Sequence, residues 1–166
     1  MVANRVFGLE MWLKIDCPST PGGGRLTLFS YASPDDGISF SVGYQCPVGT
    51  TSLDVILSHG QYSETVNFDT ILWTDMEWHH LGLNVEGSPD DASTWMEFSL
   101  DGEPQGWLGI PTIAFPCPVS GGSVILGQGQ SGENTLDVQP VFEYTVFMSE
   151  VRLWSIWASF DHWNVR

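Results

Sequence analysis

Apolar and polar residues alternate along most of this chain in short runs, which are separated by turn-forming residues. The clearest run covers residues 6–16. Five of its alternate positions are apolar, and these are Phe7, Leu9, Met11, Leu13 and Ile15. Because neighbouring side chains of a strand point to opposite faces, this pattern predicts a strand with one buried face and one largely solvated face.

Eight further segments have the length and composition of strands. They are residues 25–31, 38–45, 52–58, 64–68, 78–86, 94–100, 123–126 and 141–153. Turn-forming sequences such as Asp101-Gly102 separate them, and the long Pro/Gly-rich stretch 111–122 is predicted to be a connection. The best helix candidate, residues 149–157, follows a strand so closely that only a short terminal helical piece is expected. The pattern predicts an all-β fold, a two-sheet antiparallel β-sandwich.

The composition fits one folded domain. Hydrophobic residues make up 42% of the 166 residues and charged residues 15%, which is enough apolar surface to form a core and too little charge for a disordered chain. No low-complexity linker divides the sequence, so residues 1–166 are expected to form a single domain.

The charge balance restricts the partners. Five basic and 20 acidic residues give a formal net charge of −15, and no basic stripe could neutralise nucleic acid or an anionic membrane. Such an excess attracts divalent cations or basic protein surfaces, or simply keeps copies of the chain apart. No run of about 18 apolar residues could insert into a bilayer, and no segment resembles a signal peptide.

The three cysteines do not decide between an oxidising and a reducing compartment for this protein. Cys17, Cys46 and Cys117 each precede a proline, which places them outside strand centres. One disulfide with one free thiol and three reduced thiols fit the sequence equally well.

Six motifs, in order along the chain, carry a family resemblance. They are Val6-Phe7-Gly8-Leu9-Glu10-Met11-Trp12-Leu13-Lys14, Leu28-Phe29-Ser30-Tyr31-Ala32, Trp78-His79-His80-Leu81-Gly82-Leu83-Asn84-Val85-Glu86-Gly87, Met96-Glu97-Phe98-Ser99-Leu100-Asp101-Gly102-Glu103-Pro104, Val124-Ile125-Leu126-Gly127-Gln128 and Ser149-Glu150-Val151-Arg152-Leu153-Trp154-Ser155. Together they resemble the laminin G-like and pentraxin-like domains of the concanavalin A-like lectin/glucanase jelly rolls. The resemblance implies an extracellular or cell-surface recognition module that binds carbohydrate or glycosylated protein through loops at one end of the sandwich.

Two departures from the family pattern matter. The paired cysteines of pentraxins would fall near Glu10 and Gly82, where this chain has none, so that disulfide is not expected. The family usually has one more strand before the first one seen here. Either the chain is trimmed at one or both ends, or a partner fills that sheet edge.

The resemblance also implies a calcium site, which this chain matches only in part. Asp35 and Asp36 match the first acidic pair of pentraxins, although they equally suit a Pro-Asp-Asp-Gly turn. Gly129 and Ser131 replace expected carboxylates, leaving Gln130, Glu133 and Asp137 as the remaining candidate ligands. Calcium takes six to eight oxygen ligands, so the loss of two carboxylates should weaken binding.

No motif indicates an enzyme. The paired carboxylates of glucanases and the Gly-x-Ser-x-Gly nucleophile are absent. The Gly-rich segment 127–132 matches GxGxxG, but no helix is predicted after it, so we interpret it as a loop. His79 and His80 are adjacent on a predicted strand and point to opposite faces, which prevents joint metal binding and predicts one core and one surface residue.

The eight tryptophans are the remaining candidates for binding. Trp78 and Trp154 are assigned to the core, because large aromatic residues of a sandwich are usually structural. Trp12 shares its strand parity with Glu10, and Trp107 follows a glycine in a turn-rich segment, so both are expected to be exposed. Trp12, Trp107, Asp35 and Asp36 are therefore the predicted ligand-binding residues.

Three functions stay open at this point. The first is a non-enzymatic module that binds carbohydrate or glycoprotein, without a cofactor. The second is a structural domain that packs against other protein chains in a larger assembly. The third is calcium-dependent, pentraxin-like binding, for which the calcium ligands are incomplete.

Overall fold

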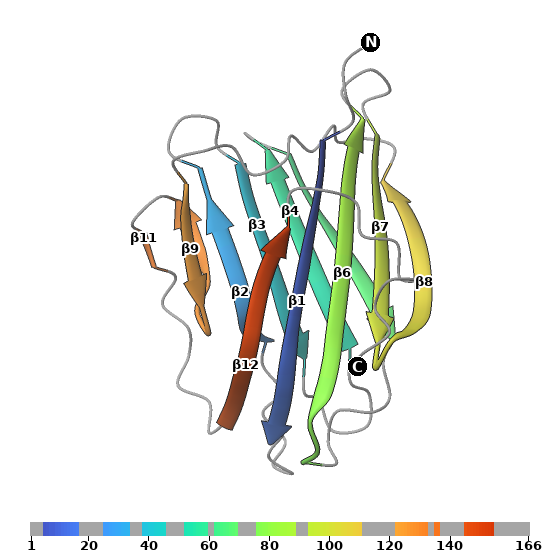
Figure 1. The fold of residues 1–166 in the computed structure, drawn as a ribbon. Coiled ribbons are helices and arrows are strands. Elements are labelled where there is room, and N and C mark those ends of the chain that lie inside the picture. Colours follow the sequence, from blue (N-terminus) through green and yellow to red (C-terminus); the bar gives the residue numbers. More distant parts are fainter. Residues whose placement is uncertain are drawn as a thin grey trace. The chain divides into compact units, whose positions relative to one another are not determined.

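A computed structural model describes residues 5–16, 25–33, 38–45, 52–59, 62–69, 76–88, 93–110, 122–132, 135–136 and 145–154. In this part of the chain all regular structure is β-strand (Figure 1). The strands are β1 (Arg5–Asp16), β2 (Arg25–Ala32), β3 (Ile38–Gln45), β4 (Ser52–His59), β5 (Tyr62–Asp69), β6 (His79–Ser88), β7 (Ser93–Leu100), β8 (Glu103–Ile110), β9 (Ser123–Leu126), β10 (Gln130–Gly132), β11 (Thr135–Leu136) and β12 (Thr145–Trp154). Within these residues there is no helix with the length and apolar character needed to cross a membrane.

The strands form two large antiparallel sheets, each in its own compact unit. The sheet of unit 1 has the order β12-β1-β6-β7-β8, and the sheet of unit 2 has the order β5-β4-β3-β2-β9. The short strands β10 and β11 pair with each other and belong to unit 2. The expected fold class, an all-β two-sheet antiparallel β-sandwich, is confirmed.

The sheet of unit 1 has one apolar face. Leu83 of β6 lies opposite Leu9 of β1 and Phe98 of β7, and all three are fully buried. Neighbouring pairs such as Met11 and Leu81 continue this face. Removing such side chains from water is the main stabilising term for a sheet, at about 1.5–3 kcal/mol for each large one. The alternation of residues 6–16 predicted this face correctly.

The sheet of unit 2 likewise has a buried apolar face, formed by Phe40, Val42, Leu53, Val55 and Leu57 among others. Its other face carries a buried ion pair between Arg25 of β2 and Asp54 of β4. The Arg25 guanidinium also donates hydrogen bonds to Thr27 Oγ1 (2.8 Å) and Ser41 Oγ (3.0 Å). Gly43 lies directly beneath the guanidinium, since a methyl group at that position would lie 2.5 Å from Arg25 Cζ.

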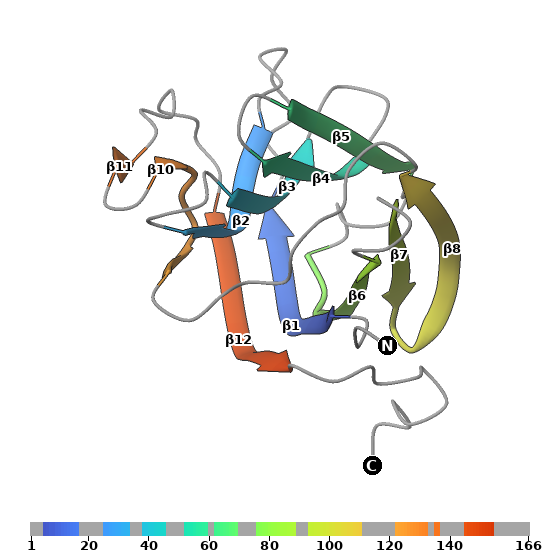
Figure 2. The ribbon, with the colours of Figure 1, turned by 90° about the horizontal axis from the view of Figure 1, so that it is seen from above.

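Strand β8 is the main element that the alternation of apolar and polar residues did not predict. Asp101 and Gly102, expected to form a turn, have φ values of 52° and 82°, as the two central residues of a tight hairpin turn require. The chain then continues as β8, which is the edge strand beside β7 (Figure 2). Pro104 and two glycines interrupt the alternation of β8, and this hid the strand.

The end of the described chain also differs from the expectation. Residues 149–154 continue β12 as a strand, so the expected terminal helical piece does not begin there. Glu150 has a φ of 51°, a local distortion that β12 accommodates without leaving the sheet. Pairing with β1 provides the backbone hydrogen bonds that hold these residues extended.

Candidate functional site

Four tryptophans lie on the second face of the unit 1 sheet, opposite its apolar face, and we call this the tryptophan face. They are Trp12 of β1, Trp95 of β7, Trp107 of β8 and Trp154 of β12. Cross-strand partners share a face, so the pairings of Trp12 with His80, Glu86 with Trp95, Trp95 with Gly109, and Glu97 with Trp107 place the first three on the same face. The contact of Trp154 with Gly8, described below, adds the fourth.

The indole of Trp95 lies close to the backbone of the neighbouring strand β8. A methyl group added to Gly109 would lie 2.9 Å from Trp95 Cζ3 and 3.1 Å from Cη2, so the ring occupies the space that a side chain would need. Trp95 is nevertheless 48% exposed. The indole is therefore partly covered by β8 and partly available to solvent.

Trp154 also lies close to a glycine of the neighbouring strand β1. A methyl group on Gly8 would lie 3.2 Å from Trp154 Cδ1, and Trp154 is 41% exposed. Trp107 is the most exposed of the four, at 59%. Exposed large aromatics grouped on one sheet face are unusual and indicate a surface that contacts something other than water.

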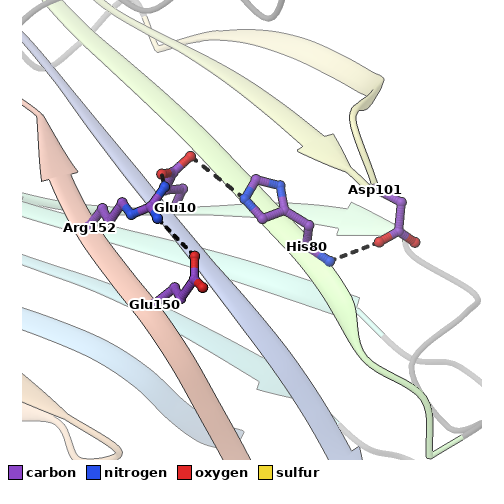
Figure 3. A network of polar contacts seen from close by, with 5 residues as sticks. All are labelled: Glu10, His80, Asp101, Glu150 and Arg152. Carbon is purple, nitrogen blue, oxygen red and sulfur yellow. Dashed lines mark hydrogen bonds and ion pairs between the residues drawn. The ribbon is translucent and has the colours of Figure 1, made fainter. Parts of the chain in front are cut away.

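A charged network lies on the same face beside Trp12 (Figure 3). Glu10 Oε1 accepts a hydrogen bond from Arg152 Nη1 (2.9 Å), and Arg152 Nη2 donates to Glu150 Oε2 (2.8 Å). The Glu10 side chain is 8% exposed, whereas those of Arg152 and Glu150 are 53% and 56% exposed. The exposed ends of Arg152 and Glu150 offer hydrogen-bond donors and acceptors next to the aromatic rings.

His80 connects this network to the β7–β8 hairpin. Its Nε2 lies 3.6 Å from Glu10 Oε2, and its ring centroid lies 5.1 Å from that of Trp12. Its backbone N–H donates to Asp101 Oδ1 (2.8 Å), while the other carboxylate oxygen of Asp101 pairs with His79 Nδ1 (2.7 Å). Burial lowers the pKa of His80 below 6.5, outweighing the opposite influence of Glu10 and Asp101.

The lowered pKa of His80 predicts a pH-dependent stability. As pH falls below 6.5, the unfolded chain takes up a proton at His80 that the folded chain does not, so the free energy of unfolding should decrease. The decrease should end once pH passes below the pKa of the folded state. Urea unfolding between about pH 5 and 7.5 should show a steeper loss for the wild type than for His80→Gln. Equal slopes for the two proteins would contradict a neutral, buried His80.

The structure changes the interpretation of several predicted residues. Trp107 lies in strand β8, not in a turn-rich connection, and it is exposed as expected. Trp12 is only partly exposed, because it packs on His80. The assignment of Trp78 and Trp154 to the core is wrong, since they are 44% and 41% exposed. Trp78 lies just before the first residue of β6. Trp154 lies on the outer face, because its ring is close to Gly8 of β1.

The two histidines lie on opposite faces, as predicted, because His79 pairs with Leu13 and His80 with Trp12. The expectation of one core and one surface residue is wrong. His80 lies on the outer face but is only 5% exposed, because Trp12 and Glu10 cover it. The His79 side chain, on the opposite face, is 14% exposed.

Most of the predicted calcium ligands lie outside the described residues, namely Asp35, Asp36, Glu133 and Asp137. The fifth, Gln130, is buried in unit 2. Its Oε1 accepts a hydrogen bond from Ser123 Oγ (2.7 Å), and its Nε2 donates to Ser30 O and Ser30 Oγ (3.1 Å each). Gln130 thus connects β10 to β2 and β9, and calcium binding stays a prediction. The three cysteines also lie outside the described residues.

No protein-family model and no curated protein matches this sequence. Among solved structures, the binding domain of botulinum neurotoxin serotype D/C is similar, with a TM-score of 0.61, 12% identity and 96% of this chain covered. The CBM40 domain of an IT-sialidase from Ruminococcus gnavus, bound to α2,3-sialyllactose, has a TM-score of 0.56 and 11% identity over 96% of this chain.

The chain spans 35% of the toxin binding domain and 80% of the CBM40 chain. Identities this low show a shared fold alone. The fold is therefore a β-sandwich similar to those of these two domains, while the likeness to laminin G-like and pentraxin-like domains rests on the sequence motifs.

Proposed function

We propose that this chain is a non-enzymatic module that binds carbohydrate or glycosylated protein, and that the tryptophan face is its binding surface. The half-exposed indoles of Trp95 and Trp154, each close to a glycine of the neighbouring strand, are the observation that carries this proposal. A sugar ring presents one apolar C–H side, and a flat aromatic ring presents a matching apolar surface with polar groups at its edge. A module of this kind would act where glycans are displayed, at or outside the cell surface.

The neighbouring charges support recognition without catalysis. Glycoside hydrolysis needs two carboxyl groups that flank the scissile bond and can exchange protons. Glu10 and Glu150 are instead both held by Arg152, and the side chain of Glu10 is buried. The exposed parts of Arg152 and Glu150 are suited to hydrogen bonds with sugar hydroxyl groups. The similar solved structures are binding domains as well, which agrees with this proposal.

A pair of glycine variants tests the proposal without removing any aromatic ring. Gly109→Val should push Trp95 away from β8 and weaken binding to glycans on an array by about tenfold or more, because the ring can no longer occupy the space beside residue 109. Gly106→Val is the matched control on the same strand. Nothing lies within 4 Å of the position of its added carbon, so its binding should equal that of the wild type.

Binding that is lost in both variants, or in neither, would contradict a role for the Trp95 ring. Absence of any glycan signal from the folded wild-type protein would overturn the proposed function itself.

A second candidate function, an interaction domain within an assembly, is favoured by one observation in unit 2. Val124 and Leu126 of the edge strand β9 are 46% and 47% exposed. Edge strands with exposed apolar side chains are common sites of pairing with other chains. A chain that binds no glycan but forms defined oligomers, which Leu126→Asp dissociates, would favour this function.

A further inference from the structure

We infer that the tryptophan face binds linear glycan chains that lie across its strands, and that about four or five sugar units are needed for full affinity. This inference rests on the proposed function and adds the class of ligand, an extended chain as opposed to a single terminal sugar. It comes from the positions of three exposed tryptophans, Trp95, Trp107 and Trp154, along the sheet of unit 1.

One row of residues crosses the sheet and leads from Trp154 to Trp107. Gly8 of β1 is the cross-strand partner of Asn84 of β6. Glu97 of β7 pairs with Asn84 on one side and with Trp107 of β8 on the other. The Trp154 ring lies beside Gly8, since a methyl group on that glycine would lie 3.2 Å from Trp154 Cδ1. Direct partners lie side by side on one face, so the row runs across the strands with a tryptophan at each end.

The exposed aromatic surface lies at the two ends of this row. Trp154 and Trp107 are 41% and 59% exposed, whereas Asn84 and Glu97 between them are 0% and 7% exposed. Trp95 adds to the end at β8, because it lies two residues from Glu97 on β7 and is thus a diagonal neighbour of Trp107. The face therefore has two aromatic areas. The β8 area consists of Trp95 and Trp107, and the β12 area consists of Trp154.

The two areas are too far apart for one sugar ring. In the order β12-β1-β6-β7-β8, three strand spacings separate β12 from β7 and four separate it from β8. At about 4.8 Å for each spacing, the strands that carry the two areas lie about 14–19 Å apart. A pyranose ring is similar in width to an indole and contacts only one area. A chain that advances by roughly one strand spacing with each sugar needs about four or five units to reach both.

The two areas should fill in a definite order. The β8 area has two indoles and offers the larger apolar surface, so a short glycan should bind there. The β12 area has one indole, with the half-exposed Arg152 and Glu150 on the same strand to form hydrogen bonds (Figure 3). Once a chain occupies the β8 area, its contact with the β12 area is intramolecular and adds affinity without a second ligand.

A length series of linear glycans tests this inference. The array carries linear oligosaccharides of glucose, mannose, galactose and N-acetylglucosamine, each from the monosaccharide to the hexasaccharide, beside branched glycans that end in the same sugars. For a series that binds, the affinity of the full chain should rise by about tenfold or more from the disaccharide to the pentasaccharide. The hexasaccharide should bind no more tightly than the pentasaccharide.

Variants at the two areas show whether they act together. Trp154→Ala should lower the affinity for the pentasaccharide to about that for the disaccharide and leave disaccharide binding unchanged, whereas Trp95→Ala should weaken both. Leu153→Ala is the matched control. Leu153 is 48% exposed, and as the neighbour of Trp154 in β12 it points to the opposite face, so its removal should preserve the length dependence.

The outcomes separate the two proposals. A disaccharide that binds as tightly as the pentasaccharide, or array binding confined to the branched glycans, would overturn the inference and leave the binding function standing. The inference would also be overturned if Trp154→Ala weakened disaccharide and pentasaccharide binding equally, or if Leu153→Ala removed the length dependence as well. No binding to any glycan would overturn the binding function, and the inference with it.

Discussion

Replacing Asp54 with alanine should lower the free energy of unfolding by about 3 kcal/mol or more, the largest loss of stability expected from any single change considered for this chain. Asp54 is 1% exposed and is the ion-pair partner of Arg25, whose side chain is 24% exposed. Without the carboxylate, the partly buried guanidinium keeps only hydroxyl partners, Thr27 and Ser41. Leaving such a charge unpaired costs much more free energy than the intact ion pair contributes to stability.

Urea unfolding followed by tryptophan fluorescence measures this loss. Glu64→Ala is the matched control, because it removes an exposed carboxylate from the same unit and should change stability by less than about 0.5 kcal/mol. A double variant in which Arg25 and Asp54 are both replaced by apolar residues should recover much of the loss, since no charge is then left unpaired. A small effect of Asp54→Ala would show that water compensates Arg25 in its place.

Removing an exposed tryptophan side chain from the tryptophan face should give the largest effect on binding. Trp95→Ala and Trp107→Ala should each weaken glycan binding by about thirtyfold, the loss typical of a tryptophan at the centre of a binding surface. Both residues are about half exposed or more, so thermal unfolding should change little. Titration calorimetry with the best glycan of the array measures the affinity, and a melting curve for each variant checks the fold.

Leu126→Ala provides the control for the loss of exposed apolar surface, because Leu126 is 47% exposed and lies on β9 of unit 2. Its affinity for the glycan should match that of the wild type. A binding loss with Leu126→Ala as large as with Trp95→Ala would place the ligand elsewhere or show a general effect on the fold.

Period-two alternation was sufficient to predict most strands and the buried faces. It worked wherever one parity was consistently apolar, as in β1, and it missed β8, because glycine and proline carry no hydrophobic signal. The pairing of β1 with β6 also bears on the resemblance to pentraxins. Glu10 and Gly82, the positions near which the paired cysteines of pentraxins would fall, are direct cross-strand partners.

The candidate site was only partly predictable. Trp12 and Trp107 were identified from exposure arguments, but Trp95 was missed although its parity, opposite to that of Met96 and Phe98, already indicated the outer face. Trp154 was misassigned, because nothing in a sequence reveals that its ring lies over Gly8. Such contacts depend on strand order, which alternation alone does not determine.

The pairing of β12 with β1 has a consequence for the folding rate. The Glu10–Arg152 contact joins residues 142 positions apart, and it links the edge strand β12 to β1 in a five-stranded sheet. Contacts between such distant positions require the chain to close a long loop before they return any free energy, so a topology rich in them folds in milliseconds to seconds. We therefore expect the β12 edge of the tryptophan face to form only after the first and last described strands have met.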